Sequence, residues 1–454
     1  MRYALLLLVM LSAPAALAQS DDERIRQLTD EVAGLKSLVY ELQTQVAKLS
    51  AAGASTSAPV PTAAPAAPAA PVAVAQPGAA DSTHGVTISG TLDGYYAYNG
   101  NSPAGRVNSL RAYDVSSNSF SLNQADLIVE SAVDKAAGKR FGVRVDLQWG
   151  QATQTLQGNP ANELRPEIYR NVFQAYGTYV FPVGNGITVD FGKWASSLGV
   201  ENNYTKDQLN YSRAFWFNFL PYYHTGVRAS YAVSNALTVN YWLVNGVGQT
   251  EDFNAHKDQL FGFVLTPAES LTWTFNYYVG QEHADVAYIT NPPAGQTNLP
   301  NQQGTSIVPI ANAPDGSLRI TDTYLAWQAT KALTLAAEAD YVEQRLYSYS
   351  TAAHVTGGAV YAGYKLSPQW AVAARAEYLA DRGGLFSGTS QYLKEGTLTL
   401  DYRPVDGFLM RTEYRRDQSN QPYFLGHSLA TLEHAQPTFT LGLVWWFGPK
   451  QGSW

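Results

Sequence analysis

Segments in which apolar and polar side chains alternate recur from Gly85 to the end of the chain. The stretch FGVRVDLQWG, at 141–150, has apolar side chains at every second position, with Arg144, Asp146 and Gln148 between them. Successive side chains of a β-strand point to opposite faces of the sheet, so this period of two predicts strands with one apolar and one polar face. The same period is found at 86–98, 187–191, 271–279, 333–341, 372–378, 408–415 and 439–447. An all-β fold is therefore expected in this region.

Short and long connections alternate between these segments. Turn-forming residues make short connections at 134–139, 182–186, 234–235, 267–270, 330–331, 367–368 and 404–407. Longer and more polar connections lie near 99–119, 150–168, 196–222, 246–256, 281–316, 346–353, 380–390 and 417–434. Seven short and eight long connections separate about sixteen strands, and this arrangement is typical of an antiparallel transmembrane β-barrel. A soluble sandwich has no reason to place its short turns at one end and its long loops at the other.

Charged side chains occupy mid-strand positions in the polar phase of the alternation. An arginine that faced lipid near the midplane of the membrane would destabilise the barrel by about 2–4 kcal/mol. We therefore expect these side chains to face water inside the barrel. The candidates for lining a pore are Arg144, Asp146, Arg228, Glu338, Asp340, Arg375, Glu377, Arg411, Glu413 and Arg415. Aromatic residues in the apolar phase gather near strand ends, as the two membrane interfaces favour. They are Trp149 at the long-loop end and Trp273, Trp370, Trp445 and Phe447 at the short-turn end.

Three segments of different composition precede the predicted barrel at 85–454. Residues 1–18 combine a basic start, a short apolar run and a small-residue end, which predicts a secretory signal peptide. Residues 19–50 are predicted to form an α-helical coiled coil, and residues 51–84, rich in alanine and proline, an extended linker. We therefore expect the barrel in the outer membrane of a Gram-negative-type bacterium and the coiled coil in the periplasm.

The predicted coiled coil carries apolar side chains at alternating steps of three and four residues. The predicted oligomerisation positions are Ile25, Leu28, Val32, Leu35, Val39, Leu42, Val46 and Leu49. β-Branched residues at the first apolar position and leucine at the second favour a dimer. Analogy with general porins favours a trimer instead. Two alternatives remain open, a lone amphipathic helix on the chain's own barrel and a segment that binds peptidoglycan.

The predicted number of strands bears directly on function. The interior of an eight-stranded barrel is filled by its own side chains, whereas a barrel of sixteen to eighteen strands encloses an aqueous channel. Passive diffusion of small hydrophilic solutes or ions through an outer-membrane porin is therefore the expected function. The alternative is a structural tether that links the barrel to the periplasm or the cell wall through the coiled coil. Mixed charges on the predicted inner face favour neither cations nor anions.

The connection at 196–222 is long enough to fold back inside a barrel of this width. Its charged residues are Glu201, Lys206, Asp207 and Arg213, which we expect to lie at the constriction of the channel. A lid over the outer mouth is the alternative. The aromatic run FWFNFLPYY, at 215–223, is expected to return the chain to the rim, where its rings pack against the wall or lie at headgroup level.

No residue pattern points to catalysis, a metal or a cofactor, and we expect the chain not to be an enzyme. His224 has no second histidine at ligand spacing and is expected to have a hydrogen-bonded structural role. Neighbouring carboxylates such as Glu338 and Asp340 are better explained as charge on a pore wall than as an acid/base pair. The chain contains no cysteine, and its net charge of −7 argues against a nucleic-acid partner. The expected partners are outer-membrane lipid, small hydrophilic solutes and further copies of the chain.

The run NYSRAFWFNFLPYYHTGVRASY, at 210–231, resembles a segment of the β-barrel porin family described as porin-2, OmpL-like. The likeness rests on the residues 210–213, on the aromatic stretch with Pro221, and on the run from His224 to Arg228. The preceding VDFGKWASSLGVE, at 189–201, is similar to the family as well. The resemblance covers most of the chain after residue 85. It implies an outer-membrane location and a passive channel, and it supplies no catalytic residues.

Overall fold

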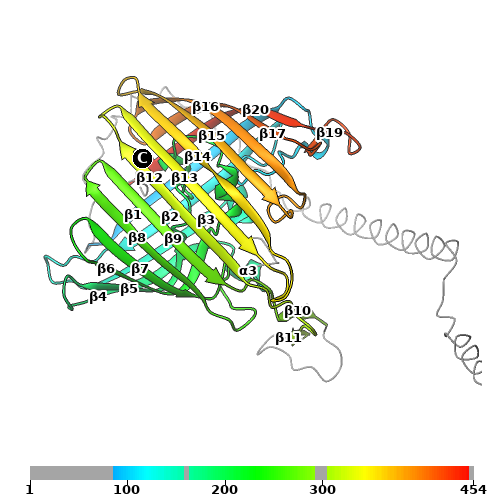
Figure 1. The fold of residues 1–454 in the computed structure, drawn as a ribbon. Coiled ribbons are helices and arrows are strands. Elements are labelled where there is room, and N and C mark those ends of the chain that lie inside the picture. The colour runs from blue at the N-terminus through cyan, green and yellow to red at the C-terminus, as the bar shows by residue number, and fades with distance from the viewer. Residues whose placement is uncertain (1–84, 158–162, 292–303, 449–454) are drawn as a thin grey trace, which may run out of the picture. The chain divides into compact units, whose positions relative to one another are not determined.

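Sixteen strands close into one antiparallel barrel in the computed structural model, which describes residues 85–157, 163–291 and 304–448 (Figure 1). Each barrel strand pairs with the next one along the chain, and β1 closes the ring on β20, with Gly90 opposite Phe447 and Asn99 opposite Thr438. The predicted sixteen-stranded antiparallel barrel is confirmed. The predicted signal peptide, coiled coil and linker lie outside the described residues.

The barrel strands contain between 8 and 15 residues. A tilted strand needs about 9–11 residues to cross a membrane, so the barrel has the height that a bilayer requires. The strands are β1 (Thr87–Asn99), β2 (Ser119–Ser131), β3 (Phe141–Trp149), β4 (Val172–Phe181), β5 (Ile187–Ala195), β6 (Tyr223–Ala232), β7 (Leu237–Val244), β8 (Asp258–Ala268), β9 (Leu271–Gly280), β12 (Leu318–Gln328), β13 (Leu333–Gln344), β14 (Ala353–Lys365), β15 (Trp370–Arg382), β16 (Gln391–Val405), β17 (Phe408–Ser419) and β20 (Ala435–Phe447). Among the described residues, no helix is both long and apolar enough to span a bilayer.

The two faces of the barrel wall differ as the alternation predicts. In β16, Leu398 is 64% exposed on the outer face, whereas Thr397 and Thr399 on the inner face are 2% and 3% exposed. The outward aromatic residues that the sequence places near strand ends, such as Trp149 and Trp370, are also exposed. An apolar outer face is suited to lipid contact, because hydrocarbon offers no partners for polar groups.

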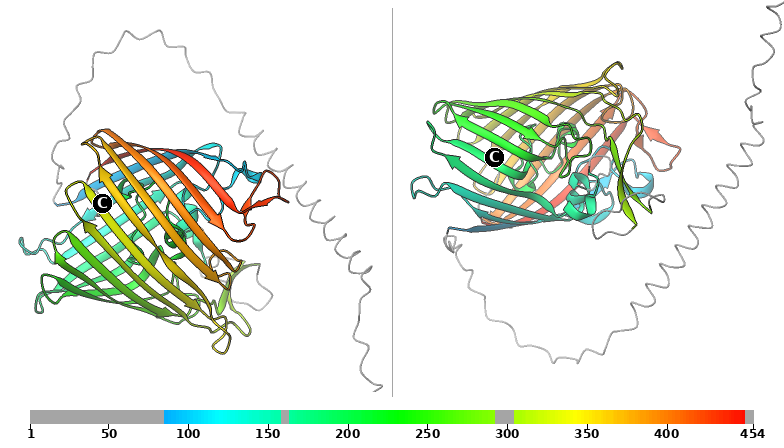
Figure 2. Two further views of the ribbon diagram at one scale, coloured as in Figure 1. Left: turned by 45° about the horizontal axis from the view of Figure 1, so that its top comes forward. Right: turned by 90° about the horizontal axis from the view of Figure 1, so that it is seen from below.

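The two ends of the barrel carry different connections (Figure 2). Short turns join the strands at one end, and the longer connections at the other end contain small elements of their own. These elements are η1 (Ala104–Arg106), α2 (Gln151–Gln157), α3 (Pro166–Tyr169), η2 (Thr205–Asp207), α4 (Phe215–Phe219), the hairpin of β10 (Val286–Thr290) with β11 (Thr305–Pro309), and the hairpin of β18 (Phe424–Leu425) with β19 (Leu432–Glu433). The sequence did not predict them, because elements this short show no full period of alternation.

Candidate functional site: a loop inside the barrel

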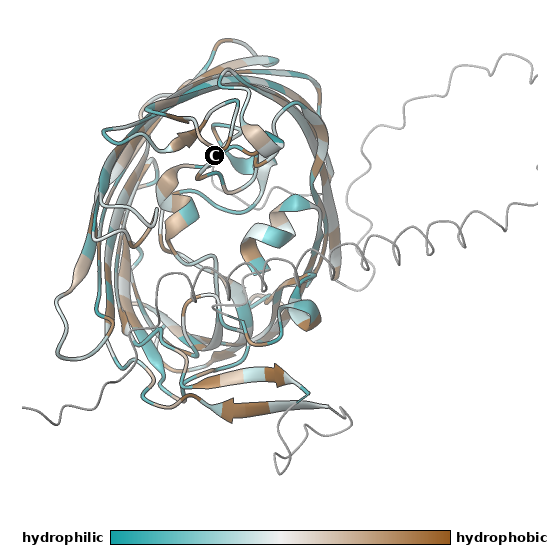
Figure 3. Cartoon of the chain, turned by 90° about the vertical axis from the view of Figure 1, so that its right-hand side faces the viewer, coloured by the Kyte–Doolittle hydropathy of each residue, from teal (hydrophilic) through white to brown (hydrophobic). Residues whose placement is uncertain are grey.

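The connection at 196–222, called the inner loop below, lies inside the barrel. It leaves β5 and returns to β6, and these two strands pair with one another up to that point. Along its course it bonds to inner-wall residues far apart around the ring, including Gln124 in β2, Asp322 in β12 and Glu413 in β17. Figure 3 shows short helices within the ring of strands. The inner loop therefore crosses the lumen and does not form a lid over the mouth.

Carboxylates of the inner wall accept hydrogen bonds from the backbone of the inner loop. Both oxygens of Glu413 accept, one from the N–H of Tyr211 at 2.6 Å and one from that of Ser212 at 2.9 Å. Glu377 binds the two successive N–H groups of Phe215–Trp216 in the same way, each at 2.8 Å. A buried loop backbone needs partners for its polar groups, and charged acceptors form the stronger hydrogen bonds. These two wall residues thus bind the loop without any requirement on its side chains.

Arginines of the same wall donate to the carbonyl oxygens of the inner loop. Arg411 donates to the carbonyls of Thr205, Gln208 and Asn210 at 3.2, 2.7 and 3.0 Å. Its remaining donors form a bidentate pair with Asp401, with both distances at 2.7 Å. A guanidinium has five N–H donors in a rigid fork, which suits this bridging of a folded backbone to a wall.

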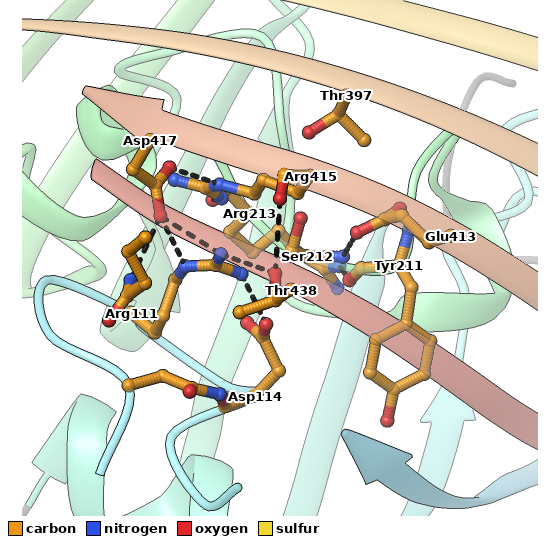
Figure 4. Close-up of polar contacts among 12 residues, drawn as sticks. Arg111, Asp114, Tyr211, Ser212, Arg213, Thr397, Glu413, Arg415, Asp417 and Thr438 are labelled. Atoms are coloured by element: carbon orange, nitrogen blue, oxygen red, sulfur yellow. Dashed lines mark hydrogen bonds and ion pairs between the residues drawn. The ribbon is translucent and has the colours of Figure 1, made fainter. Parts of the chain in front are cut away.

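Two further arginines bind the part of the inner loop that leads back to β6. Arg415 donates to the carbonyl of Arg213 and pairs with Asp417 at 2.6 Å (Figure 4). Arg375 donates to the carbonyl of Ser212 at 2.7 Å. These inward-facing arginines, which the sequence suggests as pore-lining, are 2% exposed or less and are covered by the loop.

The charged residues of the inner loop are themselves buried and paired. Arg213 is 1% exposed and donates to the carbonyls of Asn202, Asn203 and Tyr211 at 3.0, 2.9 and 2.8 Å. Its guanidinium also lies 4.8 Å from the ring centre of Tyr113. Arg213 therefore holds the loop in its folded shape, and almost none of its surface is available to a solute.

The other three charged residues of the inner loop have similar surroundings. Glu201 pairs with Arg375 at 2.7 Å and accepts the N–H of Ala214 at 2.8 Å. Lys206 and Asp207 are buried neighbours whose charged groups lie 3.7 Å apart. Glu201 thus pairs with the wall, while Lys206 pairs with Asp207 within the loop itself.

The remaining predicted wall residues divide between covered and accessible positions. Covered positions include Glu338, which accepts the N–H of Val200 at 2.8 Å, and Asp340, which is 4% exposed. Asp146 accepts a hydrogen bond from the hydroxyl of Tyr204 in the inner loop, and Arg144 donates to the same hydroxyl at 3.1 Å.

Among the wall residues predicted to line the pore, Arg228 is accessible, because 25% of its side chain is exposed. Other wall residues that bind the inner loop were not singled out from the sequence, although their polar phase could have indicated them. They include Asp93, Gln124, Gln174 and Asp322.

An apolar cluster lies inside the barrel beside helix α4. Phe215 and Trp216 of the inner loop are fully buried there, against inward-facing side chains of the wall such as Trp242, Leu260 and Tyr278. The sequence predicts a return of this run to the rim, but its rings lie inside the barrel and pack on an apolar section of the inner wall. The prediction of a position at the rim differs from the structure because several strands carry apolar residues on both faces near the long-loop end. The alternation of apolar and polar residues does not reveal such positions.

A section of the inner wall stays accessible on the short-turn side of β4–β7, whereas toward the long loops the apolar cluster covers the inner face of β5–β7. Half-buried inward-facing residues lie on neighbouring strands there: Tyr176 and Thr178 on β4, Arg228 and Ser230 on β6, and Asn240 on β7. By contrast, the inner faces of β1, β16, β17 and β20 are buried at nearly every inward position. The accessible section is mainly neutral and polar, with one arginine.

Cavities open near both ends of the barrel. One of about 290 Å³ lies between Lys206–Leu209 and the wall near the short turns, beside Asp401 and Arg403. Another of about 280 Å³ lies near the long loops, between α2 and the end of the inner loop at Asn218–Tyr222, beside Tyr223 of β6. Beside it, burial raises the pKa of the Glu163 carboxyl, which accepts the N–H of Thr250 at 2.7 Å. The two cavities place open volume on either side of the inner loop.

His224 has hydrogen-bonded surroundings inside the barrel. Its Nε2 lies 3.1 Å from the hydroxyl of Ser196, and its Nδ1 lies 3.2 Å from the carbonyl of Gly246. Its ring packs against those of Trp242 and Tyr278. In the part of the chain that the structure describes, no group of histidine and carboxylate side chains could hold a metal ion.

Comparison with known proteins finds similarity to porins. The model of the family described as "Putative beta-barrel porin-2, OmpL-like" matches residues 85–447. An anion-selective porin from Comamonas acidovorans aligns over 80% of this chain and 99% of its own, with 10% identity and a TM-score of 0.51, which shows the fold alone. The outer membrane channel DcaP of Acinetobacter baumannii aligns over 80% of this chain and 97% of its own, with 12% identity and a TM-score of 0.48. The chain matches no curated protein sequence.

Proposed function

Because the chain belongs to the family described as "Putative beta-barrel porin-2, OmpL-like", we propose that it is a channel for passive diffusion of small hydrophilic solutes or ions. The channel is the lumen of the sixteen-stranded barrel in the outer membrane, narrowed by the inner loop. A barrel of this size encloses an aqueous path unless something fills it. The inner loop fills part of the lumen and leaves the remainder to solutes.

The division of the inner wall is the observation that carries this proposal. The loop covers the charged section at β15–β17, where carboxylates and arginines bind its backbone. It leaves accessible the polar section at β4–β7, represented by Thr178, Ser230 and Asn240. Neutral hydroxyl and amide groups can replace part of the hydration of a passing solute without binding it tightly, which favours passage over retention.

Conductance in a planar lipid bilayer tests the proposed function. The purified full-length protein is expected to insert in discrete steps of ionic current, because each inserted barrel adds a fixed aqueous path. Heat-denatured protein at the same concentration is the control for leakage caused by detergent. A folded barrel that inserts into the bilayer and passes no current would contradict the proposed function.

For the N-terminal segments we propose export through a signal peptide at 1–18, self-association through a periplasmic coiled coil at 19–50, and a linker at 51–84. The heptad positions from Ile25 to Leu49 support self-association. A trimer is the proposed assembly by analogy with general porins, although the heptad residues themselves favour a dimer. Removing residues 22–80 is expected to lower the number of subunits per particle in detergent, measured by light scattering as the particle mass divided by the mass of the shortened subunit. An unchanged number of subunits would contradict this role. Binding of peptidoglycan by the full chain, lost on the same removal, would favour the tether instead.

A further inference from the structure

Arg228 differs from the other arginines of the mid-barrel wall in its exposure. It lies on β6 with its side chain on the inner face, directly opposite Asp190 on β5. Its Nε donates to Asp190 at 2.6 Å, and 25% of its side chain remains exposed. The side chains of Arg375 and Arg411, which bind the inner loop, are 0% and 1% exposed. Arg228 therefore offers its charge to the accessible section of the lumen.

Three aromatic rings surround the guanidinium of Arg228. The rings of Tyr176, Trp194 and Trp242 have centres 5.2, 5.0 and 5.7 Å from its central carbon. Contacts of this kind stabilise the cation and limit the orientations of its plane. They also keep water from part of its surface, which strengthens the interaction of the remaining surface with a charged ligand. The rings of Trp194 and Trp242 pack edge to face, so this side of the group is rigid.

The two terminal nitrogens of Arg228 are available for a ligand. Among the described residues, Arg228 makes one hydrogen bond, from Nε to Asp190. Its two Nη atoms make none to any described residue and are not fully buried. A guanidinium edge with two parallel N–H donors matches the two oxygens of a carboxylate or a phosphate. Asp190 offsets the charge in part, which allows a bound anion to leave again, as conduction requires.

We propose that Arg228 is a binding site for the oxyanion group, carboxylate or phosphate, of solutes that pass through the barrel. Tyr176, Trp194 and Trp242 orient the guanidinium, and Asp190 limits the affinity. The site makes the accessible path favour anions over cations. This inference rests on the channel function proposed above and names the class of solute that the channel selects.

Reversal potential across a salt gradient tests the site. Arg228→Gln is expected to lower the anion-to-cation permeability ratio about two- to fivefold, the range for a partly screened charge. Asp190→Asn is expected to raise the ratio, because the guanidinium then lacks its counter-charge. This opposite sign separates a charge effect from damage to the wall. Arg319→Gln is the matched control, because Arg319 also lies beside a carboxylate, that of Glu343 at 4.0 Å, but on the outer face of β12. An unchanged ratio in Arg228→Gln channels of normal conductance would overturn the proposal.

Binding in detergent separates this inference from the channel function. Acetate and inorganic phosphate are added separately, and tryptophan fluorescence is recorded, because Trp194 and Trp242 lie beside Arg228. A saturable change in the wild type that is lost in Arg228→Gln is expected, and the two probes show which oxyanion binds. Arg228→Lys keeps the charge but not the fork, so weaker binding with a nearly normal permeability ratio is expected. A wild-type barrel that conducts but shows no saturable response to either anion would also overturn the site. A barrel that binds but does not conduct would contradict only the channel function.

Discussion

Removing the inner loop is expected to raise the single-channel conductance several-fold. Residues 197–221 are replaced by Asn-Gly, which joins Ser196 to Tyr222 in a two-residue hairpin. The backbone of these two residues already pairs at 3.0 Å, so β5 and β6 should keep their register. The charged inner wall at β15–β17 then becomes hydrated, and the lumen of a sixteen-stranded barrel opens to ions.

The control for this excision is removal of the β10–β11 hairpin, which forms a separate sheet outside the ring of strands (Figure 3). It removes a long connection of similar size without touching the lumen, so the conductance should stay near the wild-type value. Equal conductance in the wild type and in the folded inner-loop variant would mean that the loop does not limit the path.

The strands and their order could be predicted from the sequence because they depend on local patterns. Alternation marks each strand by itself, and a short turn allows the next strand to pair with little choice of partner. For example, the pairing of β16 with β17 follows directly from the turn at Asp406–Gly407. The fold of the barrel is thus encoded mainly in contacts between neighbours in sequence.

The path of the inner loop could not be predicted from such patterns. Glu413 binds Tyr211 and Ser212 across more than 200 positions of the chain, and Glu377 binds Phe215 across 162. These bonds go to the loop backbone, so they leave no mark in the sequence of the loop itself. Its length permitted a position inside the barrel but did not require one.

Inward direction and access to solute proved to be separate properties. Arg411 and Arg228 both stand in the polar phase of their strands, and both face inward. Arg411 is covered by three carbonyls of the inner loop, whereas Arg228 lies where the loop does not reach. The sequence places both on the inner face equally well, and the course of the loop alone distinguishes them.

The central claim is that solutes pass along the section of the inner wall at β4–β7, while the inner loop covers the section at β15–β17. The chain has no native cysteine, so a single introduced cysteine can report access to a charged thiol reagent. Asn240 lies half-buried on the accessible section. Thr399 is 3% exposed and accepts a hydrogen bond from Asn210 of the loop at 2.7 Å.

Modification of Asn240→Cys and Thr399→Cys channels during current recording tests this claim most directly. A negatively charged methanethiosulfonate reagent is expected to react with Asn240→Cys and to reduce the current, since the attached group occupies the path. Thr399→Cys is expected to stay unmodified, and to become reactive once the inner loop is excised. Rapid block of Thr399→Cys in the intact protein, with no effect on Asn240→Cys, would contradict the account.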